Sequence, residues 1–439
     1  MTLRNPRRWL ALACVCAVSI VILPSPASAA VFCRGQRATI IGTRGIDYIV
    51  GTDEPDVIAG LTGLDQIFGG DGTDVICGGK GDDFLIGGRG HDSLHGNQGS
   101  DELFGEEGHD LLITGLGRTG GMAGGPGNDE LLGGSGFDTA SFIDSAAAVE
   151  ADLRDGTAVG DGIDHLRDIE AAIGSGFDDT LLGDDGDNLL VGGGGSDSLF
   201  SRGNGGVLGP SPATSGVDIL VGDGGRQRIP GDDVLEGGTG LNVADFSSAG
   251  AGLHVDLEAG TAIGDGIDRL SDIQIVTGSI FDDTIVGDDT NNAFRPSAGN
   301  DSINGGEGTD TAVFSDAHEG IIVDLGAGTA TGEGSDSLAG FESVWGGPWR
   351  DQLVGDANGN ALDGGRGNDN LVGNDGDDFL GGGAGRDHLD GGDGVDYCHG
   401  EESSVSCEPD APPTGPGEVT ASALFSRPWF AFLPSSFRP

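Results

Sequence analysis

The chain has few of the residues that build a conventional globular core or that bind nucleic acids. Aromatic residues make up 5% of its 439 residues, and it contains only two tyrosines and two methionines. Lysine and arginine number 21 against 72 aspartates and glutamates, so the formal charge is −51. Such a chain would be repelled by nucleic acids and anionic membrane surfaces. Low hydrophobicity with high net charge favours disorder until bound cations neutralise the charge.

Sequence motifs for catalysis are missing as well. No serine lies in G-x-S-x-G, and His318-Glu319 is not part of H-E-x-x-H. Paired carboxylates such as Asp82-Asp83 could catalyse acid–base hydrolysis, but their regular recurrence favours a metal-binding or solvated-turn role. The sequence therefore predicts a binding or structural protein and no enzyme.

Glycine, in contrast, is abundant, with 88 residues, and it is regularly spaced. Residues 42–113 divide into eight consecutive units of nine residues: GTRGIDYIV, GTDEPDVIA, GLTGLDQIF, GGDGTDVIC, GGKGDDFLI, GGRGHDSLH, GNQGSDELF and GEEGHDLLI. Glycine opens every unit, aspartate holds the sixth place and an aliphatic residue holds the eighth. Because glycine does not recur at every third residue, a collagen helix is excluded.

Each place in the unit has a physical reason. The glycine-rich half supplies backbone positions with positive φ and is typical of a tight turn. The last three residues are β-branched, aromatic or aliphatic and predict a very short strand. Since side chains alternate along a strand, the central aliphatic of each triplet faces inward. Turns and strands repeated in this way predict a coil whose strands stack in parallel.

The sixth-place aspartates then fall into two rows. If two units make one full coil, residues eighteen apart stack, and the rows are Asp47, Asp65, Asp83 and Asp101 on one edge and Asp56, Asp74, Asp92 and Asp110 on the other. Rows of carboxylates at strand spacing repel one another unless cations lie between them. A flexible shell of carboxylate and carbonyl oxygens suits Ca²⁺ better than Mg²⁺.

These units resemble the hemolysin-type (RTX) nonapeptide, G-G-x-G-x-D-x-U-x. The resemblance implies an all-β fold, a right-handed parallel β-roll or β-helix solenoid loaded with calcium. The alternative is a disordered Gly/Asp-rich linker, but a linker has no need of an aliphatic residue in every ninth position.

The nonapeptides continue beyond this block. They resume at 124 and 133 and then alternate with three longer inserts, which match one another at offsets of 104 and 68 residues and share the motifs D-L-x-x-G-T-A and G-[DE]-G-x-D-x-L. We expect the inserts to form wider β-helical coils of the same solenoid. The predicted metal ligands are Asp47, Asp56, Asp65, Asp74, Asp83, Asp92, Asp101, Asp110, Asp129, Asp138, Asp179, Asp197, Asp283, Asp301, Asp310, Asp351, Asp369, Asp378, Asp387 and Asp396.

Some units carry a different residue in the sixth place or interrupt the repeat. Asp218 and Asp233 also keep an aspartate there, whereas Asn188, Gln227, Asn242, Asn292 and Asn360 replace it. Because an amide offers one neutral oxygen, we expect weak metal binding or none at those units. The Gly/Ser/Pro stretch at 201–215 is expected to be a flexible break.

The first 29 residues are typical of a signal peptide for export. Arg4, Arg7 and Arg8 precede an apolar run from Trp9 to Leu23, and Ala27-Ser28-Ala29 is a cleavage site. A membrane anchor is the alternative, but the apolar run is too short for one. We expect a secreted, extracellular, monomeric protein with no transmembrane anchor and with an unidentified partner at a cell surface or in an extracellular matrix.

Four cysteines remain after removal of the signal peptide, which suits an oxidising compartment. Three pairings are possible. Cys33–Cys77 and Cys398–Cys407 are favoured because each pair brackets one end of the repeats, where a solenoid needs a cap. Zinc binding is the alternative, although no C-x-x-C motif is present.

The expected organisation is a signal peptide at 1–29, an N-terminal cap at 30–41, an RTX block at 42–142, β-helical coils with interspersed RTX units at 143–345, a second RTX block at 346–399, a cap at 400–408 and a disordered tail at 409–439. Two functions fit this organisation. The first is a calcium-binding protein with a structural or surface-interaction role, whose β-roll folds when Ca²⁺ binds. The second is an RTX-associated enzyme, such as one acting on polysaccharides at the face of the β-helix.

Overall fold

The computed structural model describes residues 30–201, 217–223, 231–238, 240–264, 266–400, 403–405 and 407. All regular elements in these ranges are β-strands, as the sequence predicted, and they number 43. No helix of this part is long and apolar enough to span a membrane. The expected signal peptide at 1–29, all but the first residue of the break at 201–215 and the tail at 409–439 lie outside the described residues.

The N-terminal block is a stack of parallel strands in which residues eighteen apart are neighbours. Tyr48 is in register with Gln66, and Val57 with Val75. Each chain pass therefore makes one coil from two units, as the spacing predicted. The strands are β1 (Phe32–Cys33), β2 (Gln36–Arg37), β3 (Ile40–Ile41), β4 (Tyr48–Val50), β5 (Val57–Thr62), β6 (Gln66–Gly72), β7 (Val75–Lys80), β8 (Phe84–Gly90), β9 (Ser93–Gln98), β10 (Glu102–Gly108), β11 (Leu111–Ala123) and β12 (Glu130–Ser141).

The core is a double column of aliphatic side chains between the strands. The eighth residue of every unit faces inward, and none of these side chains is more than 9% exposed: Ile49, Ile58, Ile67, Ile76, Leu85, Leu94, Leu103 and Leu112. Met122, Leu131 and Ala140 continue the columns. Burial of one such side chain stabilises the fold by about 1.5–3 kcal/mol, so each coil adds a thin strip of core to the next.

The three inserts continue the stack, but they are not simply wider coils. In the first insert, β13 (Glu150–Asp152), β14 (Thr157–Val159) and β15 (Ile163–Arg167) form an antiparallel meander, while β15 pairs in parallel with β12. The chain reverses at Gly156, whose φ of 66° most side chains would disfavour. The inserts thus continue the stack, and the sequence did not predict that the middle strand of each runs antiparallel to its neighbours after the tight turn at G-T-A.

The other two inserts fold in the same way and alternate with nonapeptide coils. Their antiparallel triplets are β23 (His254–Asp256), β24 (Thr261–Ile263) and β25 (Ile267–Ser271), and β31 (Ile322–Asp324), β32 (Thr329–Thr331) and β33 (Ser335–Ala339). The coils between the inserts contain β16 (Ala171–Ile173), β17 (Thr180–Leu182), β18 (Leu189–Gly193), β19 (Ser198–Phe200), β20 (Val217–Asp223), β21 (Val234–Glu236), β22 (Leu241–Asp245), β26 (Ile275–Thr277), β27 (Thr284–Val286), β28 (Ala293–Arg295), β29 (Ser302–Asn304), β30 (Thr311–Val313) and β34 (Ser343–Trp345).

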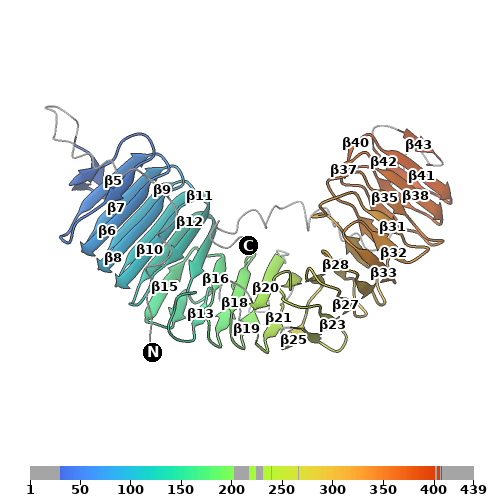
Figure 1. Cartoon of the computed structure of the whole chain (residues 1–439), viewed down its shortest axis with the longest axis horizontal. Coiled ribbons are helices and arrows are strands. Elements are labelled where there is room, and N and C mark those ends of the chain that lie inside the picture. The colour runs from blue at the N-terminus through green and yellow to red at the C-terminus, as the bar shows by residue number, and fades with distance from the viewer. Residues whose placement is uncertain are drawn as a thin grey trace, which may run out of the picture.

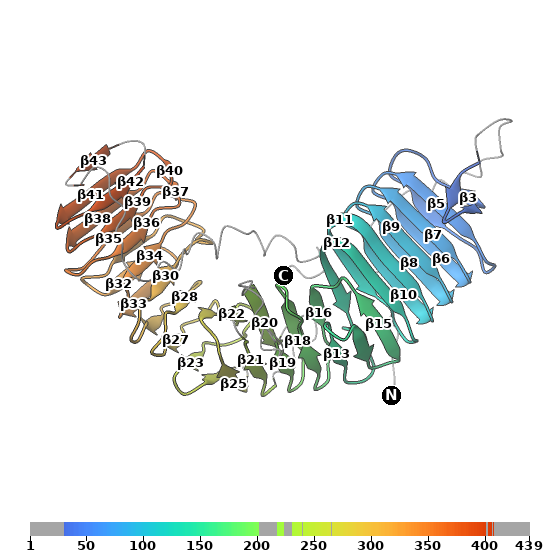
Figure 2. The same ribbon diagram turned by 180° about the vertical axis from the view of Figure 1, so that it is seen from behind.

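The C-terminal block returns to the eighteen-residue register, with Asn370 opposite His388. It contains β35 (Gln352–Val354), β36 (Ala361–Asp363), β37 (Arg366–Gly367), β38 (Asn370–Asp375), β39 (Phe379–Gly381), β40 (Ala384–Gly385), β41 (His388–Asp393), β42 (Tyr397–His399) and β43 (Ser403–Val405). The coils follow one another in chain order along a curved axis, with the N-terminal block at one end and this block at the other (Figures 1 and 2).

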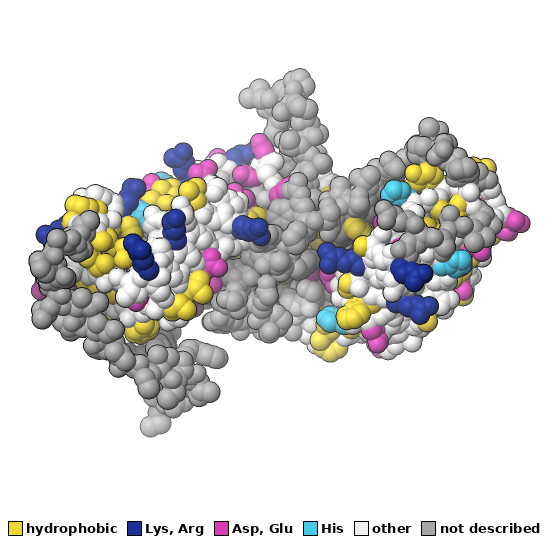
Figure 3. Space-filling model, turned by 90° about the horizontal axis from the view of Figure 1, so that it is seen from above, with side chains coloured by type: hydrophobic (Ala, Val, Ile, Leu, Met, Phe, Trp, Pro, Cys, Tyr) yellow, Lys and Arg dark blue, Asp and Glu magenta, His cyan; other side chains and the backbone are white. Residues whose placement is uncertain are grey.

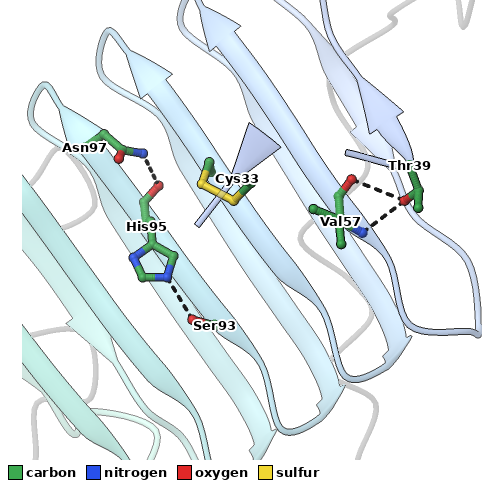
Figure 4. Close-up of a disulfide and its surroundings, with 7 residues drawn as sticks. Cys33, Thr39, Val57, Ser93, His95 and Asn97 are labelled. Carbon is green, nitrogen blue, oxygen red and sulfur yellow. Dashed lines mark hydrogen bonds between the residues drawn. A yellow bond between two sulfur atoms is a disulfide. The ribbon is translucent and has the colours of Figure 1, made fainter. Parts of the chain in front are cut away.

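A disulfide closes each end of the stack. Cys33 in β1 is bonded to Cys77 in β7, and Cys398 in β42 is bonded to Cys407. Both favoured pairings are confirmed, and no cysteine thiol of these four is left as a zinc ligand. Figure 4 shows the N-terminal disulfide beside β9, where the His95 ring lies within hydrogen-bonding distance of Ser93 Oγ.

Candidate metal-binding turns

The sixth-place aspartates form two continuous ladders along the edges of the N-terminal block. From Asp65 to Asp110, Oδ1 of each sixth-place aspartate accepts a hydrogen bond from the backbone N–H of the aspartate one coil earlier. On one edge, Asp65 N donates to Asp83 Oδ1 at 2.8 Å, and Asp83 N donates to Asp101 Oδ1 at 2.8 Å. On the other edge, Asp74 N donates to Asp92 Oδ1 at 2.8 Å. The stacking that the sequence predicted brings these side chains together in the expected rows.

The second carboxylate oxygen of most ladder aspartates is buried and has no hydrogen-bond partner. This holds for Oδ2 of Asp65, Asp74, Asp83, Asp92, Asp101, Asp110, Asp129, Asp138, Asp301, Asp310, Asp369 and Asp378. A buried carboxylate oxygen without a partner costs several kcal/mol or more in free energy. Regular repetition of this cost along two edges indicates that a ligand outside the polypeptide normally satisfies these oxygens.

Glycine makes room for this arrangement. A Cβ on Gly87, the first residue of its unit, would lie 2.5 Å from Asp92 Oδ2. A Cβ on Gly90, the fourth residue, would overlap the carbonyl oxygen of Gly72 in the coil below, and the φ of Gly90 is 142°. The glycines therefore let the turns stack closely and bring backbone carbonyl oxygens to the same edge as the carboxylates.

Burial also perturbs the acidity of the ladder. The pKa of Asp83, Asp101 and Asp110 is raised to about 7, mainly by desolvation and also by the charge of neighbouring aspartates, while the backbone hydrogen bond to Oδ1 opposes the shift. In the C-terminal block, the same causes raise the pKa of Asp369 to about 7. Without a cation, the folded turns therefore disfavour the negative charge that their carboxylates carry in water.

These features fit a hard divalent cation. The donor set is carboxylate and carbonyl oxygen, which Ca²⁺ binds with six to eight ligands. No group of three or more carboxylate, histidine or cysteine side chains in the described ranges is placed to hold a metal by itself, so backbone carbonyls would have to complete a shell. The ladder aspartates are buried within the turns, and the carboxylates that show on the described surface in Figure 3 are scattered singly or in small groups.

Five of the twenty predicted ligands lie in turns of a second kind. In these turns, which we call closed, the backbone N–H of the second residue of the unit donates to Oδ2 of the sixth. The five aspartates are Asp47, Asp56, Asp179, Asp283 and Asp351, with N–Oδ2 distances of 2.5–2.9 Å. The corresponding amides Asn188, Asn292 and Asn360 accept the same bond. We call a turn open when Oδ2 of its aspartate has no such donor.

The structure also adds ladder residues that sequence reasoning missed. Each insert returns a side chain to the ladder: Asp129 N donates to Asp164 Oδ1, Asp233 N to Asp268 Oδ1, and Asp301 N to Asp336 Oδ1, at 2.9–3.1 Å. Glu170, Gln274 and Glu342 do the same on the other edge. For Asp164, Asp268 and Asp336, the sequence feature that could have identified them is the G-[DE]-G-x-D-x-L motif shared by the inserts, because its aspartate is the ladder residue.

The carboxylate that precedes a sixth-place aspartate has a structural role. Asp82 Oδ1 accepts the backbone N–H of Ser100, and Asp282 Oδ1 accepts that of Asn300, both 2.8 Å away in the next coil. The paired carboxylates therefore hold successive turns together, one through each member of the pair.

The fold and its turns define a calcium-binding β-roll. The chain belongs to the family of proteins with the RTX calcium-binding nonapeptide repeat, whose model matches residues 41–76, 50–85, 78–112, 122–140, 173–206, 277–312, 345–380, 354–389 and 372–403. These segments together cover about half of the chain, and most of the inserts lie between them. No curated protein matches the chain.

Proposed function

We propose that the protein is exported and that its β-roll folds when Ca²⁺ binds to the turns. The main support is the set of buried Oδ2 atoms without a partner, repeated on both edges of the stack. With a formal charge of −51, the chain resists its own collapse until cations neutralise it. Calcium at the turns would satisfy the buried Oδ2 atoms and would also reduce the repulsion between carboxylates. Folding is therefore coupled to calcium binding.

The folded solenoid then has a structural or surface-interaction role and no enzymatic one. Its coils build a long, thin scaffold whose ends are closed by disulfides. The paired carboxylates that resemble an acid–base pair in sequence are used in hydrogen bonds between turns. This use favours a scaffold over a hydrolytic site on the β-helix face.

Circular dichroism of the exported chain, with CaCl₂ and then EGTA added, tests the coupling. The chelated protein should be mostly unfolded and should gain β-structure with half-saturation on the order of 10⁻⁴–10⁻³ M, as in extracellular calcium modules. The same concentrations of MgCl₂ are the control and should induce little structure. A chelated chain that keeps the full β-spectrum at pH 7 would contradict the proposal.

A further inference from the structure

Open and closed turns are not mixed at random along the solenoid. The closed turns occur in consecutive pairs, and each pair makes one full coil, at 42–59, 174–191, 278–295 and 346–363. The first of these coils follows the N-terminal cap, and each of the others follows an insert. A closed coil therefore begins the run of nonapeptides after the cap and the run after each insert.

The hydrogen bonds of a closed coil account for both carboxylate oxygens. Asp283 Oδ1 accepts the backbone N–H of Leu253 at 2.8 Å, and its Oδ2 accepts that of Ser279 at 2.7 Å. The Ser279 hydroxyl adds a bond to Oδ1 at 2.8 Å. Asp351 is held in the same way by Ile321 and Gly347. These donors already offset part of the negative charge on both oxygens, so a cation would gain less there than at a buried oxygen that has no donor.

In the three closed coils that follow an insert, the second turn carries an asparagine, whereas in the coil after the cap it carries Asp56. Asn292 Oδ1 accepts the backbone N–H of Asp288 at 2.9 Å, which corresponds to the bond that Asp283 Oδ2 makes. Within the described part of the preceding insert, no N–H donates to Asn292 as Leu253 does to Asp283, so one acceptor oxygen is enough. In the coils that follow an insert, the alternation of aspartate and asparagine thus follows the number of N–H donors at each turn.

The neighbouring open turn differs at one atom. Asp301 lies one coil beyond Asp283 on the same edge, and both side chains are 2% exposed. Asp301 Oδ1 accepts the N–H of Asp283 at 2.8 Å, but its Oδ2 has no partner. The cause lies at the second residue of the unit: φ is 68° at Ser297, so the N–H does not reach the carboxylate, whereas Ser279 has no positive φ.

We propose that calcium takes carboxylate ligands from the open turns alone, and that the closed coil after the cap and after each insert contributes none. This assignment rests on the function proposed above. The five closed-turn aspartates are therefore removed from the predicted ligands. Calcium-bearing runs begin one coil beyond the cap and beyond each insert, and each run starts on a coil that is held by its own hydrogen bonds.

Three matched pairs of aspartates test the assignment. Each pair joins a closed and an open turn in adjacent coils of one edge: Asp56 with Asp74, Asp283 with Asp301, and Asp351 with Asp369. One variant carries D74N, D301N and D369N, and the other carries D56N, D283N and D351N. Asparagine keeps the Oδ1 acceptor of the ladder, so each variant should fold in saturating CaCl₂, which circular dichroism checks.

Bound calcium per chain is then measured by equilibrium dialysis in saturating CaCl₂. The open-turn variant should bind about three ions fewer than the parent, since Ca²⁺ needs its carboxylates, and the closed-turn variant should bind the parent's number even if it is less stable. Equal losses in both variants, or no loss in the open-turn variant, would overturn the assignment. A parent chain that binds no calcium would instead overturn the proposed function. The single variants D301N and D283N give the same comparison if a triple variant does not fold.

Discussion

The cap at the N-terminal end gives a prediction with a local reporter. Cys33 is 1% exposed and ties the cap to β7 across 44 residues of sequence. Cys77 is in register with His95 on the next strand of the same face. His95 is 3% exposed, and its pKa is lowered to about 4, first because burial disfavours the charged ring and second because of the positive charge of Arg34 in the cap.

Replacement of both cysteines of this disulfide by serine should open the cap. A cross-link that closes a loop of 44 residues stabilises the folded state by about 4 kcal/mol in the chain-entropy model. Because each coil of a solenoid contacts only its neighbours, the loss should fall on the first coils and not on the whole chain. Once exposed, His95 should regain a pKa near its ordinary value.

Proton NMR of the histidine rings in the calcium-loaded protein measures this change. The pKa of His95 should rise from about 4 toward the 6.5 of an exposed ring in C33S/C77S. The matching variant C398S/C407S opens the other end and should leave His95 unchanged. Since the folded pKa lies below the unfolded value, burial of this ring costs stability as the pH falls from about 6.5 to about 4, and C33S/C77S should lose that acid sensitivity. A ring that still titrates near 4 in this variant would refute the idea that the disulfide holds the cap in place.

Two further predictions concern the turns. Gly90→Ala should lower the urea midpoint of the calcium-loaded protein by about 1–3 kcal/mol of stability or more, because alanine is strained at a φ of 142° and its Cβ overlaps the carbonyl oxygen of Gly72. Gly45→Ala is the control, since a Cβ there has no neighbour nearer than 3.8 Å. Equal midpoints for the two variants would contradict the close stacking of the turns. In EGTA, lowering the pH from 7 to 5 should increase β-structure. Carboxylates such as Asp83 and Asp369 have a pKa raised to about 7 in the folded state. The folded state therefore binds more protons than the unfolded state over this range and gains stability as the pH falls. An ellipticity that does not change over this range would exclude such proton uptake.

The nonapeptide pattern was sufficient to predict the stack of coils. The period of nine places an aliphatic such as Leu94 in the core and an aspartate such as Asp92 at the turn, and the structure has the two units per coil on which the predicted rows depended. These are local consequences of alternation along a strand and of glycine-rich turns. The disulfide pairing followed as well, because only the ends of a stack need a cap.

The distinction between open and closed turns was not available from residue types. Leu61, Asn97 and Glu106 occupy the second place of their units with positive φ, and their turns are open. Gly347 could adopt such a φ without strain, yet its turn is closed and its N–H bonds to Asp351. The sequence predicted all of these aspartates as equivalent ligands.

By itself, the sequence determined the coil, its core and the rows of aspartates, since these depend on the periodic placement of side chains along the chain. Only the tertiary structure decided which carboxylate oxygens remain free for a cation and how each insert returns Asp164, Asp268 or Asp336 to the ladder. The physical reason is that a hydrogen-bond partner comes from the neighbouring coil. Its identity depends on register and on the direction of a backbone N–H, and neither is written in a single repeat.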